Sequence, residues 1–121
     1  MFVNFYVFNI SGLLSCSSES STVWGSSSNT FIFSLRNKEG LAPFKSMVIK
    51  ASRAIYSKPL FGPTFGEGHD IHISDHADVS SGSNANFGTS YSTPSAVQDR
   101  LTILTGSRYF TPDDWEAFYL W

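Results

Sequence analysis

Short runs of apolar and β-branched residues alternate with polar stretches along most of the chain. The clearest run is 31–35 (FIFSL), which ends at the polar cluster 36–40 (RNKEG) with glycine in last place. β-branched and aromatic residues favour strands, and a polar cluster that ends in glycine favours a turn. Similar runs, each bounded by Gly, Pro, Ser or Asp, predict strands at 46–50, 54–57, 70–74, 87–92, 101–104 and 115–120. The pattern therefore predicts a mainly β chain.

Two segments have features of helical turns. Val97, Leu101 and Leu104 are spaced i, i+4 and i+7, which predicts a turn of helix that begins near residue 95. The alternation within 101–104 also favours a strand, so we expect the helical turn to end there. Residues 111–114 (TPDD) have the cap, proline and acid of a capping box, which predicts one helical turn before the last strand.

The first 30 residues differ from the remainder of the chain. Residues 1–14 are apolar but shorter than the roughly 20 residues of a membrane-spanning helix, and Asn4 and Asn9 interrupt them, so we expect no membrane span. Residues 15–30 are dominated by serine, which is typical of a linker or loop. We expect an N-terminal extension over 1–23 and one folded domain over 24–121.

Charge and cysteine content narrow the choice of partners and compartment. The formal net charge is −2, without the basic excess that contacts to phosphates need, so we expect no nucleic-acid partner. The single cysteine, Cys16, cannot form an intrachain disulfide, which favours a reducing compartment such as the cytoplasm. Two alternatives for 1–14 stay open: a secretory signal, which would lack a basic beginning, and a truncated start of the chain.

Three glycines stand close together before the strand predicted at 70–74. Gly62, Gly66 and Gly68 lie in a stretch that also holds Pro63. Phosphate-binding loops open a helix and carry a further glycine or a Lys-Ser/Thr pair, and neither follows here. We therefore expect the glycines to act through backbone geometry, with positive φ at Gly66 and Gly68, in a tight connection between two strands.

All three histidines and three carboxylates lie within residues 69–78, which is compatible with a transition-metal site. In a strand, however, Asp70 and His72 point to one face and His69 to the other. We expect Asp70 and His72 to be exposed, and His69 to be half-buried and hydrogen-bonded. A hydrolase or metal-dependent enzyme that uses His69, Asp70 and His72 remains the alternative to a binding module.

Other catalytic chemistry has little support in the sequence. No Gly-x-Ser-x-Gly motif is present, and Cys16 has no neighbouring cation to activate it. We expect no cofactor and no enzymatic activity.

Several motifs together resemble one protein family. They are 29–35 (NTFIFSL), 54–56 (AIY), 62–71 (GPTFGEGHDI), 86–88 (NFG) with Tyr91, 104–106 (LTG) and 110–118 (FTPDDWEAF), which includes Glu116. In this order and spacing they resemble the C-terminal two thirds of a TLDc domain. The resemblance extends from about residue 24 to residue 120, roughly four fifths of the chain.

The resemblance implies a fold and a function. It implies a mainly β (α+β) fold, an antiparallel two-sheet sandwich with short helical turns. The family is associated with oxidation resistance and with binding the vacuolar proton-pumping ATPase, so the resemblance implies a non-enzymatic module that binds a protein partner. The residues it marks for motif or binding roles are Gly62, Gly66, Gly68, His69, Asp70 and Glu116.

This chain departs from the family pattern in two ways. Glu67 stands where the family usually has a third glycine, and the N-terminal part of the domain has no counterpart. We therefore expect a sandwich that is incomplete on its N-terminal side. The β-prone segment 2–10 is expected to pair as a substitute edge strand or to promote aggregation. A fragment without independent function is a third possibility, and the sequence leaves the oligomeric state open.

Overall fold

The computed structural model of the chain describes residues 4–8, 23–57, 62–76 and 82–113. These residues form short strands and one short 3-10 helix, η1 (Ala51–Arg53). The strands are β1 (Asn4–Phe8), β2 (Val23–Gly25), β3 (Phe31–Arg36), β4 (Phe44–Met47), β5 (Ile55–Ser57), β6 (Thr64–Phe65), β7 (Ile71–His72), β8 (Ser83–Asn84) and β9 (Tyr109–Phe110). Within the described ranges, no helix is long and apolar enough to cross a membrane.

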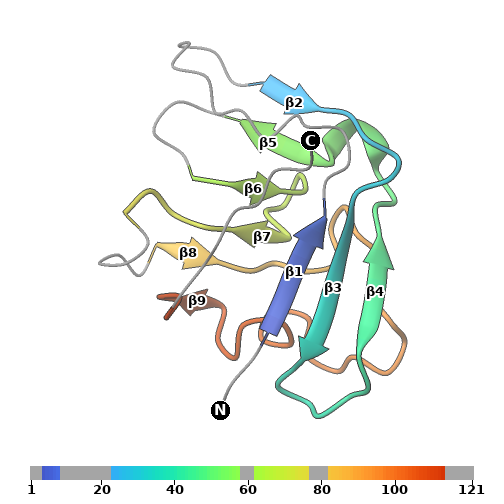
Figure 1. Cartoon of the computed structure of the whole chain (residues 1–121), viewed down its shortest axis with the longest axis vertical. Coiled ribbons are helices and arrows are strands. Elements are labelled where there is room, and N and C mark those ends of the chain that lie inside the picture. The colour runs from blue at the N-terminus through green and yellow to red at the C-terminus, as the bar shows by residue number, and fades with distance from the viewer. Residues whose placement is uncertain (1–3, 9–22, 58–61, 77–81, 114–121) are drawn as a thin grey trace.

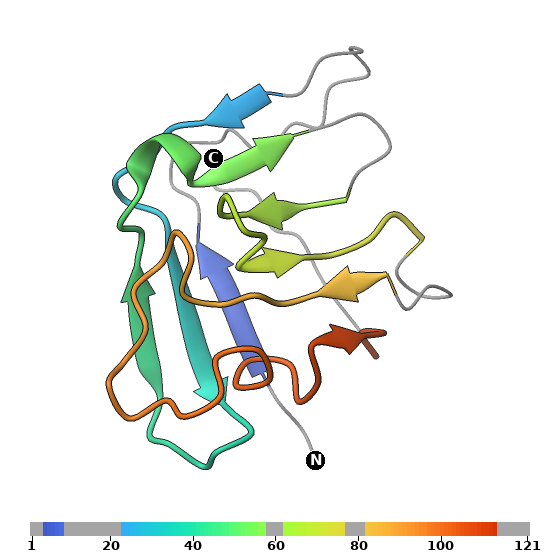
Figure 2. The same cartoon turned by 180° about the vertical axis from the view of Figure 1, so that it is seen from behind.

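The strands form two sheets in which every pairing is antiparallel. The smaller sheet has the order β1-β3-β4, and the larger has the order β2-β5-β6-β7-β8-β9. Figures 1 and 2 show that the strands of the smaller sheet run across those of the larger one. The predicted mainly β fold, with two antiparallel sheets and little helix, is confirmed.

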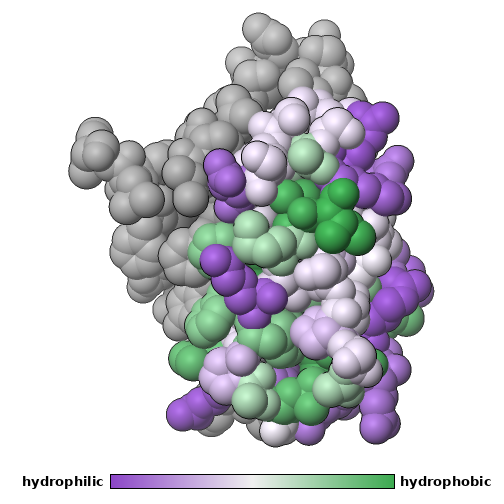
Figure 3. All heavy atoms as spheres, turned by 90° about the vertical axis from the view of Figure 1, so that its right-hand side faces the viewer, coloured by the Kyte–Doolittle hydropathy of each residue, from purple (hydrophilic) through white to green (hydrophobic). Residues whose placement is uncertain are grey.

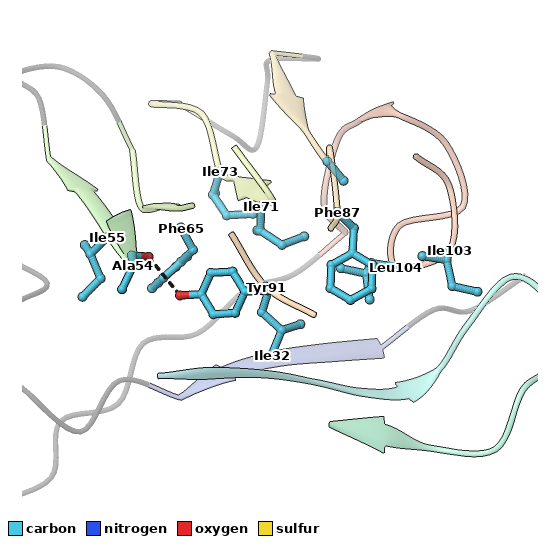
Figure 4. Close-up of a cluster of buried hydrophobic side chains, with 11 residues drawn as sticks. Ile32, Ala54, Ile55, Phe65, Ile71, Ile73, Phe87, Tyr91, Ile103 and Leu104 are labelled. Atoms are coloured by element: carbon cyan, nitrogen blue, oxygen red, sulfur yellow. Dashed lines mark hydrogen bonds between the residues drawn. The ribbon is translucent and has the colours of Figure 1, made fainter. Parts of the chain in front are cut away.

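A cluster of buried apolar side chains lies between the two sheets (Figure 4). Ile32 enters it from β3, and Ile55, Phe65 and Ile71 enter it from three neighbouring strands of the larger sheet. Burying a side chain of this size stabilises the fold by roughly 1.5–3 kcal/mol. Loop residues complete the cluster, among them Phe87, Tyr91, Ile103 and Leu104.

Several strands lie where the sequence predicts them. The predictions at 31–35, 54–57 and 70–74 correspond to β3, β5 and β7, whereas β4 begins two residues before the predicted start at 46. The N-terminal segment forms β1, which pairs with β3 at the edge of the smaller sheet, so the expected edge strand is confirmed. The short strands β2, β6, β8 and β9 were not predicted.

Two predicted strands are wrong. Residues 87–92 form turns and bends, with a single antiparallel bridge between Tyr91 and Val48, because most of their N–H groups bond to a side chain instead. Residues 101–104 form turns, since the N–H of Ile103 donates to the carbonyl of Asp99 at 3.1 Å. The helical spacing of Leu101 and Leu104 with Val97 therefore predicted this segment better than the alternation that favours a strand.

The structure leaves some predictions untested. The helical turn predicted over 111–114 extends past residue 113, the last described residue, and the strand at 115–120 and Glu116 lie outside the described residues. Most of the serine-rich segment, residues 15–22, lies outside them as well. The boundary between an extension over 1–23 and a domain over 24–121 stays a prediction.

The two faces of the smaller sheet differ in character. On the inner face, the hydroxyls of Ser34 and Ser46 are buried and have no hydrogen-bond partner among the described residues. On the outer face, the Nζ of Lys45 lies 4.1 Å from the centre of the Phe31 ring. Figure 3, which looks at the side of the molecule where β4 lies, shows apolar side chains interspersed with hydrophilic ones. Charged side chains therefore interrupt the apolar surface on this side.

Candidate functional site

A tight turn over 66–69 joins β6 to β7. The N–H of His69 donates to the carbonyl of Gly66 at 3.2 Å, and the N–H of Gly66 donates to the carbonyl of Ala54 at 3.1 Å. Gly66 has φ 91°, a left-handed conformation that favours glycine, and a Cβ there would lie 1.9 Å from Oδ1 of Asp70. The predicted positive φ at Gly66 is confirmed.

Gly62 and Gly68 are needed for a different reason. Neither has a positive φ, so the prediction for Gly68 is wrong. A Cβ on Gly68 would lie 2.5 Å from Cγ2 of Thr89, and a Cβ on Gly62 would lie 1.8 Å from the carbonyl oxygen of Ile73. These two glycines allow neighbouring segments to approach closely.

The carboxylate of Asp70 is fully buried and anchors the loop that follows β8. Its Oδ2 accepts hydrogen bonds from the N–H groups of Gly88 (2.8 Å), Thr89 (3.0 Å) and Tyr91 (3.3 Å). Its Oδ1 accepts from the N–H of Ser90 at 2.9 Å and from the hydroxyl of Thr89. Hydrogen bonds to an ionised acceptor are stronger than those between neutral groups. The expectation that Asp70 is exposed is wrong.

Burial and hydrogen bonding act in opposite directions on the pKa of Asp70. Burial has the larger effect and raises the pKa of this carboxyl above its ordinary value, whereas the bonds from Thr89, Ser90 and Gly88 lower it. Burial, and then the charge of Asp70, raise the pKa of Tyr91. The hydroxyl of Tyr91 donates to the carbonyl of Ala54 at 2.9 Å (Figure 4), so it joins the loop to the start of β5.

Further hydrogen bonds fasten the 66–69 turn to the same loop. The N–H of Glu67 donates to the hydroxyl of Ser90 at 2.8 Å, and the N–H of Gly68 donates to the hydroxyl of Thr89 at 3.2 Å. The carbonyl of Gly68 accepts from Nδ2 of Asn86 at 3.1 Å. The backbone of the turn is therefore held along its length.

The rings of His69 and His72 lie side by side, with centroids 5.5 Å apart. The prediction that they point to opposite faces is wrong, because His69 has a left-handed backbone (φ 58°) and stands before β7, where strand alternation does not apply. His69 is half-buried, as predicted, whereas His72 is buried rather than exposed. Thr64 Oγ1 lies 2.7 Å from Nδ1 of His72.

Both histidines have lowered pKa values. Burial, followed by repulsion from His69, lowers the pKa of His72 from 6.5 to about 4. Burial also lowers the pKa of His69, while the negative charge of Asp70 acts in the opposite direction. These lowered pKa values favour the neutral form of both rings at pH 7.

The register of the larger sheet aligns one residue from each strand in a single row. The row is Trp24, Tyr56, Thr64, His72, Asn84 and Tyr109. Residues directly opposite each other in antiparallel strands share a face, and neighbours along a strand point to opposite faces. Because Ile55 and Ile71 point into the core, the row lies on the other face of the sheet.

At the β2 end of this row, aromatic and charged side chains meet. The Trp24 and Tyr56 rings are edge-on with centroids 4.8 Å apart, and the Tyr56 and His69 ring centroids are 5.7 Å apart. The guanidinium of Arg53 lies 4.8 Å from the centre of the Trp24 ring. We call this set, with the ion-paired Lys50 and Glu67, the aromatic-basic surface: Trp24, Lys50, Arg53, Tyr56, Glu67 and His69.

Glu67 links the turn to the cations of this surface. Its carboxylate lies 3.1 Å from Nζ of Lys50 and 3.8 Å from Nε of Arg53. All three side chains are between 41% and 51% exposed, so each ion pair contributes at most about 1 kcal/mol. The departure at Glu67 from the family pattern thus places a carboxylate between two cations.

The structure does not bring the predicted site residues together for catalysis. Both oxygens of Asp70 accept hydrogen bonds from the neighbouring loop, whereas His72 bonds to Thr64. In the part of the chain that the structure describes, no group of three or more His, Cys, Asp or Glu residues is placed to hold a metal ion. The site that forms is instead a surface of aromatic and charged side chains.

The sequence did not mark most of this surface. Of the residues predicted for motif or binding roles, only His69 lies on it. Tyr56 belongs to the resemblance motif 54–56, and Glu67 was noted as a departure from the family. Trp24, Tyr56 and Arg53 come together through strand pairing and η1, and no motif connects them along the chain.

A family model described as the TLDc domain matches residues 9–120. Searches of the curated proteins and of the solved structures find no match.

Proposed function

Since this chain belongs to the TLDc domain family, we propose that it is a non-enzymatic module that binds another protein through the aromatic-basic surface. The observation that carries this proposal is the anchored turn. The buried Asp70 fixes the loop on which the turn rests, and the turn presents Glu67 beside Arg53 and His69 beside Tyr56.

The residue types on this surface are those that contribute most to protein–protein binding. Tryptophan, tyrosine and arginine dominate binding energy at interfaces when they lie in a well-packed cluster. Here Trp24 contacts both Tyr56 and Arg53, and all three side chains are partly exposed. A surface that is already ordered loses less conformational entropy when a partner binds.

The charges suggest how the partner is recognised. Lys50 and Arg53 share Glu67 as their ion-pair partner. A carboxylate on a binding partner would complement the two cations, which favours a partner that presents an acidic side chain next to an apolar one.

The family resemblance suggests which partner to test first. TLDc domains are associated with the vacuolar proton-pumping ATPase and with oxidation resistance. We therefore propose a peripheral subunit of this pump as the partner, and a role in pump regulation or oxidative-stress protection.

The alternative of a hydrolase or metal-dependent enzyme has weaker support. Its site would need the Asp70 carboxylate to reach a substrate or metal, but this side chain is fully buried and engaged by five donors. No observation favours that function over binding.

A binding assay with purified peripheral subunits of the pump tests the proposal. We expect the full chain to bind, and Trp24→Ala or Arg53→Ala to weaken binding about tenfold or more, as for residues at the centre of an interface. Asp70 is a poor choice for this assay because its loss would disturb the fold.

Tyr109→Ala is the matched control. Tyr109 is 60% exposed and stands at the other end of the same cross-strand row, so we expect unchanged binding. Failure of the wild-type chain to bind would remove the pump as partner. Unchanged binding by Trp24→Ala and Arg53→Ala would remove the surface assignment.

A further inference from the structure

Strand β1 stands at an edge of the smaller sheet (Figure 1). Among the residues that the structure describes, it pairs only with β3. An edge strand turns alternate N–H and C=O groups away from its sheet, where they can pair with another strand.

Of the other sheet edges in the described residues, two are short and one is covered at its end. In the larger sheet, the edge strands β2 and β9 have three and two residues. In the smaller sheet, the loop after β8 covers the end of β4. The N–H of Ile49 donates to the carbonyl of Ser90 at 2.8 Å, and the N–H of Ser92 donates to the carbonyl of Met47 at 2.9 Å.

β1 lacks the features with which proteins usually protect an edge. It has five residues (NFYVF) with no charge, proline or glycine, and the flanking positions 2, 3, 9 and 10 are also uncharged. Protected edges carry lysine, proline or a bulge. The register shift between Asn4 and Phe5 is confined to one end, so most of the strand is regular.

We infer that β1 pairs antiparallel with β1 of a second copy of this chain. Antiparallel pairing of a strand with itself is self-complementary, so a two-fold axis relates the copies and the contact closes as a dimer. Full overlap of the five residues places Asn4 opposite Phe8 and Tyr6 opposite Tyr6. Since no charges oppose each other, nothing repels the two strands.

The consequence is one continuous sheet across the dimer. Three strands from each copy join in the order β4-β3-β1-β1-β3-β4. This contact is separate from the aromatic-basic surface, where Trp24 and Tyr56 belong to the larger sheet. The dimer and the proposed function can therefore be tested independently.

Sedimentation velocity over a series of concentrations tests the inference on the full chain. We expect reversible dimers for the wild type. Tyr6→Lys and Tyr6→Glu place like charges opposite each other at the two-fold axis, so each variant alone should raise the dimer dissociation constant at least several-fold. An equimolar mixture of the two should form dimers again.

Leu35→Lys is the matched control, because Leu35 is exposed on β3 rather than on the edge strand. It should dimerise like the wild type. A wild type that stays monomeric, charged variants that dimerise like the wild type, or a mixture that does not recover would each overturn the inference.

Disulfide trapping gives a second readout that does not rely on a charged variant. Tyr6→Cys in a Cys16→Ser background should form an interchain disulfide on mild oxidation, because directly opposite residues have the required separation. Leu35→Cys in the same background should not. Equal crosslinking at both positions would contradict pairing through β1.

Discussion

The Asp70 carboxylate can be buried in this protein because five donors surround it. An isolated buried charge is costly, and its hydrogen bonds offset that cost. The same bonds satisfy N–H groups from Gly88 to Tyr91 that have no strand to pair with beyond the bridge at Tyr91. Asp70 is therefore a positioning residue, which acts on the surface through the loop and the turn.

Gly66 and Gly40 form a matched pair for testing how closely the turn packs on Asp70. Both have positive φ, but a Cβ on Gly40 meets nothing within 4 Å, whereas one on Gly66 meets the Asp70 carboxylate. We expect Gly40→Ala to cost about 1 kcal/mol for backbone strain alone, and Gly66→Ala to cost roughly 2 kcal/mol more because Asp70 must shift. Urea unfolding measures both, and equal losses would contradict the close packing.

His72 gives a prediction for the pH dependence of stability. Its pKa is about 4 in the folded chain and 6.5 as the reference value, so the unfolded chain binds a proton before the folded chain does. Its contribution to stability is therefore complete above pH 6.5 and is lost as the pH falls toward 4. The loss approaches roughly 3 kcal/mol. Urea unfolding at several pH values measures it.

Two glutamine variants isolate the contribution of His72. His72→Gln removes the titrating ring, so its stability should change less between pH 6.5 and 4 than that of the wild type. His76→Gln, at an exposed position, should behave like the wild type. The same pH dependence in all three proteins would show that His72 is not the group responsible.

The sequence identified Gly66 but not the role of Asp70. Glycine before a strand, in a segment with other glycines, is a local signal of a special backbone conformation. The donors to Asp70 are mostly backbone N–H groups 18 to 21 residues further along the chain. Backbone groups are the same in every residue, so such an anchor leaves no sequence pattern.

The β3–β4 pair carries two buried serines on its inner face. In the described part of the chain, the hydroxyls of Ser34 and Ser46 lack a hydrogen-bond partner, and each unpaired buried hydroxyl costs about 1–3 kcal/mol. Replacing either with alanine removes the unpaired hydroxyl and leaves a small void. We expect Ser34→Ala and Ser46→Ala each to stabilise the protein by about 1 kcal/mol, measured as a raised midpoint of thermal unfolding.

Ser95→Ala, at an exposed loop position, is the control and should leave the midpoint unchanged. Destabilisation by both inner-face variants would mean that their hydroxyls are satisfied in solution.

Strands were predictable where local composition and tertiary pairing agree. The run at 31–35 is rich in β-formers and becomes β3, which pairs on both sides. Residues 87–92 also contain β-formers (Phe87, Thr89 and Tyr91), but the carboxylate of Asp70 accepts hydrogen bonds from most of their N–H groups, so they cannot form a regular ladder. A tertiary contact therefore overrides the local preference.

The aromatic-basic surface arises only when the larger sheet assembles. Trp24 and Tyr56 become neighbours because β2 pairs with β5, and η1 places Arg53 over the Trp24 ring. The anchored turn then adds Glu67 and His69. The family resemblance predicted the fold and a binding role. It could not predict which residues form the surface, because these contacts depend on how distant strands pair.

Amide hydrogen exchange of the wild-type chain tests most directly whether Asp70 anchors the loop beneath the turn. The N–H groups of Gly88, Thr89 and Ser90 lie outside any strand, yet each donates to the buried carboxylate at 3.0 Å or less. They should exchange as slowly as the amides of the core strands β5 to β7, since exchange requires their hydrogen bonds to Asp70 to break. Exchange as fast as at the exposed loop residue Ala96 would contradict the anchor and the surface that depends on it.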